Sequence, residues 1–337
     1  MEEAYLYKKL DNKKVRCLNC NHYCVIADSQ KGICGVRKNI DGKLYSLVYG
    51  KAVAINIDPI EKKPFFHFLP GSYSLSIATV GCNFRCLNCQ NWQISQGPRL
   101  EETRGEEISP NEIVELALKS KLPSISYTYT EPTIFLEYAL DTMKLAKKAG
   151  LKNNWISNGF LSPESAKLVI PYLDAINIDI KGFSDEFYRK VCGGRLRPVL
   201  DTAKLMKKSG VWVEITTLII PTLSDSEEMF RKIAKWIYEN LGPETPWHIS
   251  QFSGAISWKL QKIKDTPVET LEKAYQIGKD AGLKYVYMGN VFAHKGENTY
   301  CLKCGELTIE RIGYSIRRHD KNGKCPKCGE ALNLILK

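Results

Sequence analysis

Several features that would place a chain in a membrane or outside the cell are missing from this sequence. It has no run of about 18 apolar residues, the minimum for a membrane-spanning helix. The first residues, Met1-Glu2-Glu3-Ala4, lack the basic and apolar segments of a secretory signal. Internal repeats and low-complexity tracts are also missing. We therefore expect a cytoplasmic protein with no membrane partner.

Runs of arginine are missing too, although the net charge is +11. The lysines are scattered in pairs, such as Lys62-Lys63 and Lys147-Lys148. A solvated basic surface explains this pattern better than a binding face for RNA or for an acidic protein. Nucleic acid is therefore the less favoured class of partner.

The bulk composition is that of a globular protein, with 44% hydrophobic and 25% charged residues. A chain of 337 residues exceeds what one hydrophobic core usually serves. We expect a main domain with one or two small modules.

Apolar, β-branched runs alternate with segments of helical period between about residues 73 and 291. Continuous apolar runs are typical of a parallel sheet covered by helices. The sequence therefore predicts strands at 74–80, 124–129, 153–157, 175–180, 211–219, 247–252 and 285–289. Seven such strands with right-handed crossovers form either a doubly wound sheet or a complete or partial barrel, and periodicity does not choose between them.

The helices between these strands carry start and stop signals. Three of them are predicted to begin at the pairs Ser109-Pro110, Ser162-Pro163 and Thr266-Pro267. Three glycines follow lysine-rich helix ends as C-terminal caps: Gly150, Gly210 and Gly282.

The two ends of the chain differ from this central part. Residues 1–70 are rich in cysteine and include a predicted hairpin over 43–57 around Tyr49-Gly50. Residues 296–337 form a second short unit. Segments of this length rarely bury a sufficient core, so we expect metal to stabilise both.

Cysteine is the most informative residue type, since eleven of the twelve cysteines fall into three clusters. In a reducing cytosol such clusters favour metal binding over disulfides. The central cluster, Cys82-x3-Cys86-x2-Cys89, directly follows the first predicted strand of the sheet. Active sites of parallel α/β folds lie at this carboxyl end.

Three thiolates at this spacing fit one face of an iron–sulfur cubane and leave the fourth iron open. An open iron can chelate the amino and carboxylate groups of a substrate. The alternatives are a zinc site that borrows a fourth ligand and three unrelated thiols, and the spacing favours the iron–sulfur interpretation.

The motif resembles the signature of radical S-adenosylmethionine (SAM) enzymes. Nearly the whole chain resembles the AmmeMemoRadiSam-system radical SAM enzymes, which are relatives of pyruvate formate-lyase activating enzyme. Besides the central motif, the resemblance rests on Cys34-Gly35-Val36-Arg37, on residues 57–64 and 89–96, and on the C-terminal cysteine pairs.

The resemblance implies an α/β fold with a partial (β/α)6 TIM-like barrel over residues 71–295. A four-cysteine metal-binding module over 1–70 and a zinc ribbon over 296–337 would flank it. It also implies a 4Fe-4S cluster that reductively cleaves SAM to a 5′-deoxyadenosyl radical, which abstracts hydrogen from a protein or small molecule. An electron donor such as ferredoxin or flavodoxin, and companion proteins, are the implied partners.

Polar residues that would contact SAM follow the next strands of the sheet. Glu131, in a segment that resembles the family's Gly-Gly-Glu-Pro motif, would accept hydrogen bonds from the SAM ammonium. Its alternative role is to cap the helix that begins at Pro132. Ser157 and Asn158 match a segment near the ribose and carboxylate of SAM.

Asp179 and Lys181 match an Asp-Leu-Lys element at the end of the fourth strand, and residues at i and i+2 share one strand face. A buried structural ion pair is the competing interpretation. His248 on the sixth strand is a further candidate contact to adenine or substrate, although a lone histidine is more often a satisfied core residue.

Three positions depart from the family pattern. Asn88 replaces an aromatic residue that packs on adenine. Ile156 and Glu214 stand where the activating enzyme has an aspartate of a cation site and an arginine. These changes weaken the case for activation of a glycyl-radical enzyme but not for SAM cleavage.

The C-terminal cluster consists of two CxxC knuckles, Cys301/Cys304 and Cys325/Cys328. This pattern predicts a tetrahedral zinc ribbon, in preference to a rubredoxin-like iron or a ribbon that contacts nucleic acid.

The N-terminal cluster has the spacing Cys17-x2-Cys20-x3-Cys24-x9-Cys34. Zinc is the first choice for this set, and an auxiliary iron–sulfur cluster that passes electrons is the second. His22 is an alternative but disfavoured ligand. The twelfth cysteine, Cys192, is expected to be a small buried residue rather than a radical relay.

Two rival functions stay open on these residues. One keeps the cluster but modifies RNA. The other is a non-catalytic, zinc-dependent interaction protein with zinc at all three cysteine sites.

Overall fold

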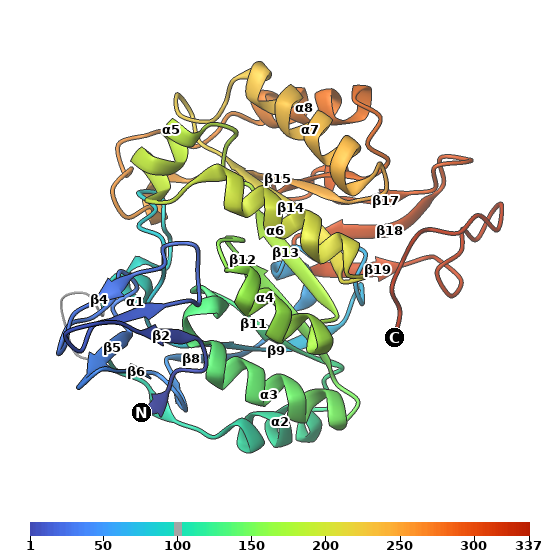
Figure 1. Ribbon diagram of the computed structural model, residues 1–337. Helices are drawn as coiled ribbons and strands as arrows, with labels where there is room; N and C mark the ends of the chain where they lie inside the picture. Colours follow the sequence, from blue (N-terminus) through green and yellow to red (C-terminus); the bar gives the residue numbers. More distant parts are fainter. Residues whose placement is uncertain (98–102) are drawn as a thin grey trace.

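The computed structural model describes residues 1–97 and 103–337. At its centre, eight strands form one sheet in the order β16-β15-β14-β13-β12-β11-β9-β8 (Figure 1). Seven of them are parallel and correspond to the seven predicted strands: β9 (Tyr73–Ala78), β11 (Ser124–Tyr127), β12 (Lys152–Ser157), β13 (Ala175–Asp179), β14 (Trp212–Ile219), β15 (Trp247–Gln251) and β16 (Val286–Gly289).

Helices follow these strands and pack against one another in chain order. They are α2 (Pro110–Lys119), α3 (Leu136–Lys148), α4 (Pro163–Val169), α6 (Leu196–Lys208), α7 (Glu227–Leu241) and α8 (Val268–Asp280). Figure 1 shows them as a layer over one face of the sheet, which distinguishes the fold from a doubly wound one. The two edge strands, β8 and β16, do not pair with each other, so the described sheet is open.

The helix ends follow the predicted signals with one exception. Ser109 forms a full capping box with Glu112, and the Ser162 hydroxyl accepts from the backbone N–H of Ser165. Thr266 does not cap α8, and this prediction is wrong. Its hydroxyl instead donates to Ile219 O and accepts from the Phe252 N–H. Buried backbone groups such as these require a hydrogen-bond partner.

The predicted hairpin over residues 43–57 is also wrong. β6 (Lys43–Ser46) pairs with β1 (Glu2–Glu3) and β5 (Arg37–Ile40), and β7 (Lys51–Ala52) pairs with β10 (Glu106–Glu107). β8 (Ala54–Pro59) joins the central sheet antiparallel to β9 through six residue pairs. Pairing with the edge strand β9 gives β8 more backbone hydrogen bonds than a hairpin with residues 43–46 would give it.

The rest of the N-terminal segment lies at the carboxyl ends of the parallel strands. It contains a second small sheet of β2 (Tyr7–Lys9), β3 (Val15–Cys17) and β4 (Val25–Ile26). Cys20 forms a β-bridge with Leu161, which follows β12, and the Asn21 N–H donates to Phe160 O at 3.0 Å. The segment therefore sits beside the edge where ligands of parallel sheets bind.

The C-terminal unit packs at the opposite, amino-terminal end of the strands. Its three strands are β17 (Thr299–Tyr300), β18 (Leu307–Ile312) and β19 (Ser315–Arg318). Arg311 of β18 is buried, donates to Phe66 O at 3.0 Å and lies 4.1 Å from the centre of the Phe66 ring. Phe68 also forms a bridge with Ile335.

Glu214 of β14 connects several segments at this end of the sheet by hydrogen bonds. Its carboxylate is fully buried and accepts hydrogen bonds at 2.7–3.2 Å from five N–H groups, those of the backbone of Phe66, His67 and Phe68 and of the side chains of Trp212 and His248. Burial alone would raise the pKa of Glu214, but the hydrogen bond and charge of His248 hold it below its usual range. The departure from the family arginine at this position therefore has a structural role.

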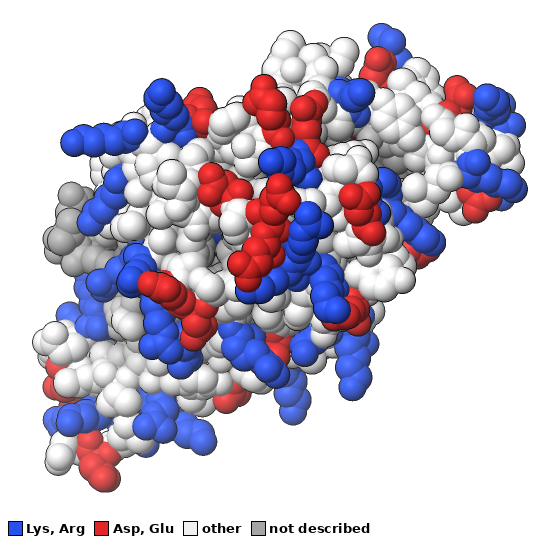
Figure 2. Space-filling view, turned by 90° about the horizontal axis from the view of Figure 1, so that it is seen from above, with Lys and Arg blue, Asp and Glu red and all other residues white. Residues whose placement is uncertain are grey.

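The surface agrees with a scattered distribution of charge. On the face seen in Figure 2, lysine and arginine residues are interspersed with acidic ones. Within the described ranges, no helix has the length and apolar character needed to cross a membrane.

We expect Glu214→Ala to lower the free energy of unfolding by about 3–5 kcal/mol, because it leaves buried N–H donors without an acceptor. Chemical denaturation would measure the change. The matched control is Glu228→Ala on α7, whose exposed pair with Lys232 contributes little, so its midpoint should stay near that of the parent protein. Equal midpoints for the two variants would contradict the structural role of Glu214.

Candidate active site

The loop that carries Cys82, Cys86 and Cys89 begins where β9 ends. It has no regular secondary structure, and its backbone pairs with the segment after β13: Arg85 N donates to Cys192 O at 2.8 Å and Leu87 N to Val191 O at 2.9 Å. The loop starts at Gly81, whose φ of +101° is one that other residues rarely adopt. A Cβ there would lie 2.7 Å from Val36 and 3.0 Å from Cys34 O, so only glycine allows this contact with the N-terminal segment.

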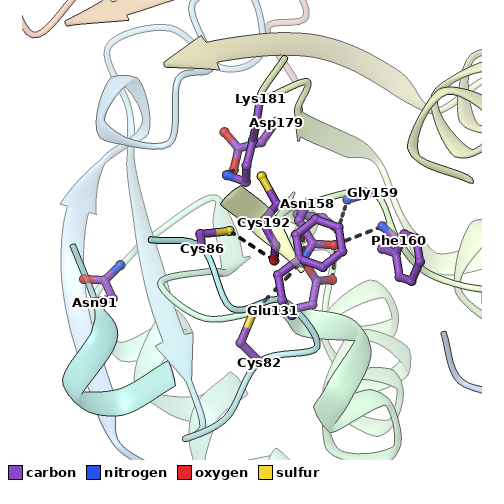
Figure 3. Close-up of polar contacts among 12 residues, drawn as sticks. Cys82, Cys86, Asn91, Glu131, Asn158, Gly159, Phe160, Asp179, Lys181 and Cys192 are labelled. Carbon is purple, nitrogen blue, oxygen red and sulfur yellow. Dashed lines mark hydrogen bonds and ion pairs between the residues drawn. The ribbon is translucent and has the colours of Figure 1, made fainter. Parts of the chain in front are cut away.

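Of the three cysteines, Cys86 is buried and Cys82 and Cys89 are half-buried. The Cys82 sulfur accepts from the Phe84 N–H at 3.4 Å, and the Cys89 sulfur lies 3.3 Å from the Ser95 hydroxyl. Cys86 points toward Cys192, and its sulfur is 4.0 Å from Cys192 O (Figure 3). The structure thus gathers the three predicted cluster ligands on one short loop.

The three sulfurs of the loop do not form the compact group that a single ion requires. In the described part of the chain, one group of three or more candidate ligands has all its ligand atoms within 4.8 Å, and it is the C-terminal cysteine set. Cys82, Cys86 and Cys89 are therefore spread more widely than ligands of one tetrahedral ion, whose sulfurs lie under about 4 Å apart. A cubane, with one iron per thiolate, needs the wider spacing.

The three thiols of the loop differ in their electrostatics. Burial raises the pKa of the Cys82 and Cys89 thiols, because it disfavours the charged thiolate unless a bound cation compensates its charge. A hydrogen bond with Cys192, together with the nearby Lys181 ammonium, lowers the pKa of Cys86 against the effect of burial. The residues present therefore fit a metal cluster.

Two buried amide atoms beside the thiols are consistent with a further ligand. Among the described residues, Asn83 Nδ2 and Asn88 Oδ1 have no hydrogen-bond partner. Buried polar groups are rarely left unpaired, so each calls for a partner such as a cofactor atom. Asn88 replaces the family's aromatic residue with a polar group at this place.

Glu131 lies at the end of β11 and is buried. Its carboxylate accepts from the Thr133 N–H and hydroxyl at 3.1 and 2.6 Å, from the Ser157 hydroxyl at 2.9 Å and from the Asn158 N–H at 2.8 Å. It therefore caps the helical turn at Pro132–Phe135, as one of the two interpretations predicts, and it also ties the end of β11 to the end of β12.

Asn158 connects this carboxylate to the cysteine loop. Its Nδ2 donates to Asn83 Oδ1 at 2.7 Å and lies 4.0 Å from the Cys82 sulfur (Figure 3). Glu131, Ser157, Asn158 and Cys82 are thus brought together by three different segments.

Asp179, the last residue of β13, forms an ion pair of 2.8 Å with Lys181, and the side chains of Lys181 and Asp179 are 17% and 29% exposed. The Lys181 ammonium interacts electrostatically with Cys86, which places the pair beside the cysteine loop. This partial exposure leaves the pair accessible to a ligand.

His248 lies elsewhere. Its Nε2 pairs with Glu214 at 2.7 Å, and its ring packs against Phe66 and Tyr287 deep in the sheet. Ile156 likewise packs among apolar residues of the segment before β9, such as Phe65. The geometry thus separates both from the cysteines, and His248 as a cofactor contact stays a sequence-based prediction.

Three residues for which the sequence predicted no contact with the site complete this region, and one of them, Cys192, is buried as expected. Asn83 lies between Cys82 and the N-terminal segment, Asn91 donates to Tyr129 O at 2.9 Å, and Cys192 lies against Cys86. Asn83 and Asn91 stand inside or next to the cysteine motif, which was the available signal. The proximity of Cys192 to Cys86 carries no signal in the sequence, since more than 100 residues separate them.

The C-terminal cysteines converge on one point. Cys301 and Cys328 sulfurs lie 3.5 Å apart, as do those of Cys304 and Cys325. These distances match tetrahedral coordination at a metal–sulfur bond of about 2.3 Å. Gly305 and Gly329 have φ of +74° and +76° and close the two knuckles. The four cysteines are therefore able to bind a metal.

The N-terminal cysteines, Cys17, Cys20, Cys24 and Cys34, line one cavity together with His22. No three of their sulfurs all lie within 4.8 Å of one another. The structure gathers this set but does not close it around a single point.

Comparison with known proteins agrees with this geometry. Residues 76–237 match the sequence profile described as the radical SAM superfamily. The protein MJ0808 of Methanocaldococcus jannaschii is 48% identical over 339 residues, covering 100% of both chains.

Two further proteins are more distant. The pyruvate formate-lyase-activating enzyme of Clostridium pasteurianum is 27% identical over 166 residues, which cover 47% of this chain and 66% of that enzyme. The structure of Streptococcus suis SuiB bound to precursor peptide SuiA has a TM-score of 0.52 at 13% identity, covering 69% of this chain and 51% of that one. The last likeness concerns the fold alone. The profile match over residues 76–237, together with the central cysteine motif inside it, assigns this part of the chain to the radical SAM superfamily.

Proposed function

We propose that this protein is a radical SAM enzyme that uses a 4Fe-4S cluster on Cys82, Cys86 and Cys89 to cleave SAM. The single observation that carries the proposal is the set of three thiols on one loop, one buried and two half-buried, at the carboxyl end of a parallel sheet. With three thiolates for four irons, such a cluster keeps one iron open for SAM. When bound and reduced, it supplies the electron that breaks a carbon–sulfur bond of the sulfonium.

The chain's own residues would bind and orient SAM. Asn158 and Asn83 lie beside Cys82, where they are placed to hold the polar atoms of the methionyl group. Glu131 holds the backbone of Asn158 in place and offers negative charge toward the SAM ammonium. Asp179 and Lys181 lie beside Cys86 and remain partly exposed, as a contact to the ribose or to the substrate requires.

The finer classification belongs to the same proposal. The family resemblance supports a partial (β/α)6 barrel and membership of the AmmeMemoRadiSam group, and the similarity to an activating enzyme supports hydrogen abstraction from a protein or small molecule. A low-potential protein such as ferredoxin or flavodoxin would donate the electron. We further propose zinc for the C-terminal cysteines, because four thiolates at tetrahedral spacing suit that ion.

Cys86→Ala is expected to abolish the formation of 5′-deoxyadenosine from SAM under anaerobic conditions with dithionite, since it removes one cluster ligand. Chromatographic detection of the nucleoside measures this. Cys304→Ala serves as the control and should retain SAM cleavage, because its site lies at the other end of the sheet. Nucleoside formation by the Cys86 variant at the parent rate would refute the proposed function.

Glu131→Gln should weaken SAM binding by about 10- to 100-fold, as expected for the loss of a hydrogen bond to a charged group worth ~1.5–3 kcal/mol. Equilibrium dialysis of the reconstituted protein measures the affinity. Glu112→Gln changes a similar carboxylate in an exposed capping box and should leave the affinity unchanged. An unchanged affinity in the Glu131 variant would restrict that residue to its capping role.

Cys304→Ser is expected to release zinc and lower the melting temperature, because a short unit loses the ion that closes its two knuckles. Elemental analysis and calorimetry test this together. Lys303→Ala alters an exposed neighbour in the same knuckle and should keep both zinc and melting temperature. Retention of stoichiometric zinc by the cysteine variant would show that the site is not the one proposed.

A further inference from the structure

The N-terminal cysteines line a cavity whose other walls come from three parts of the chain. Besides the four thiols, the cavity is bounded by Asn19, His22, Ile26, Arg37, Asn83 and Ile134. Asn83 belongs to the loop of the active-site cysteines, and Ile134 to the helical turn after Glu131. The cavity is therefore enclosed jointly by the N-terminal segment and by the active-site edge of the sheet.

The spacing of these four sulfurs differs from that of the C-terminal set. A tetrahedral zinc ion holds its sulfurs less than about 4 Å apart, and the C-terminal set has such spacing at 3.5 Å. In the N-terminal set no three sulfurs fall within 4.8 Å of one another, although the Cys20 thiol interacts electrostatically with the other three. Cys82, Cys86 and Cys89 likewise do not form a compact single-ion group.

One buried N–H donor of a residue on the cavity wall has no partner in the described part of the chain. It is Nε of Arg37, a residue that is about 1% exposed. Arg37 uses its other nitrogens to pair with Glu137 at 3.0 and 2.6 Å, so its guanidinium is fixed in place. The unpaired Asn19 Oδ1 also lies on this wall. A donor in such a position suits the sulfide and thiolate sulfurs of an iron–sulfur cluster, whose potential depends on such hydrogen bonds.

The cavity adjoins the active-site loop directly. Asn83, which follows Cys82, borders it, and His22 Nε2 lies 2.8 Å from Asn83 O. Cys34 O packs against Gly81, the residue before Cys82. A cluster in the cavity would be separated from one on Cys82 by little more than a single residue.

We propose that Cys17, Cys20, Cys24 and Cys34 hold an auxiliary 4Fe-4S cluster that relays electrons to the cluster on Cys82, Cys86 and Cys89. Zinc, the first choice from the sequence, is replaced by this assignment. The relay rests on the proposed function, whereas the presence of the auxiliary cluster does not.

The electron balance of the relay is simple. A low-potential one-electron donor protein loses one electron and is oxidised, and the auxiliary cluster accepts that electron and passes it to the active-site cluster. That electron is consumed when the carbon–sulfur bond of SAM breaks. The auxiliary cluster returns to its oxidised form, with no net proton transfer at the four cysteines.

The test uses the full chain with Cys82, Cys86 and Cys89 all changed to alanine, reconstituted anaerobically with ferrous iron and sulfide. We expect about four irons and four sulfides per chain, as one cubane requires, and a paramagnetic signal after reduction with dithionite. Adding Cys20→Ser should remove the iron and the signal, whereas adding Cys304→Ser should leave both. Zinc without iron in the triple variant, or iron that survives Cys20→Ser, would overturn the assignment.

A second measurement tests the same assignment without the triple variant, in case that variant folds poorly. The parent protein should bind about eight irons, and Cys20→Ser alone should reduce this to about four. Equal iron in the two proteins would also overturn the assignment. If the auxiliary cluster is present but the parent protein makes no 5′-deoxyadenosine, only the proposed function fails.

The relay is tested by comparing two electron sources. With reduced ferredoxin or flavodoxin, Cys20→Ser should lose most 5′-deoxyadenosine formation, while dithionite, a small reductant, should restore it. Equal relative rates with both sources would contradict the relay.

Discussion

The site depends on how the irregular cysteine loop is held. A loop without helix or strand must satisfy its backbone polar groups elsewhere, and this one does so on residues 191 and 192, on Ile94 and on the N-terminal segment. Because Cys192 O and Val191 O accept from Arg85 and Leu87, the sulfurs are positioned by a segment far away in the sequence. The close approach of Cys34 and Val36 to Gly81 fixes the start of the loop. Cluster binding therefore depends on the whole carboxyl edge of the sheet.

The two terminal units pack at opposite ends of the parallel strands. The C-terminal unit and the segment before β9 close the amino-terminal end, where Glu214 and Arg311 satisfy buried polar groups. The N-terminal unit lies at the carboxyl end, against Phe160, Leu161 and the cysteine loop. A stabilising metal suits the first position. A redox-active one suits the second, because it borders the place where an electron is needed.

In the assignments proposed above, the same residue type forms two kinds of site in one chain. Four cysteines in two CxxC knuckles converge to 3.5 Å contacts, since each knuckle turns both sulfurs to one point. Neither of the other two cysteine sets forms such a compact group. The distinction is physical: one ion draws its thiolates together, while a cubane places each thiolate on a separate iron.

Local signals in the sequence were enough to determine the seven parallel strands, most helix caps and the three cysteine clusters, because each depends on short-range pattern and backbone geometry. Tertiary structure alone decided three features. They are the location of Cys17, Cys20, Cys24 and Cys34 beside the active-site loop, the structural role of Glu214 and its partner His248, and the pairing of β8 with β9. These features arise where buried polar groups find partners 61 to 148 residues away, or where a strand edge chooses between competing local registers. Periodicity and motif spacing carry no information about such long-range pairing, so only the folded chain reveals it.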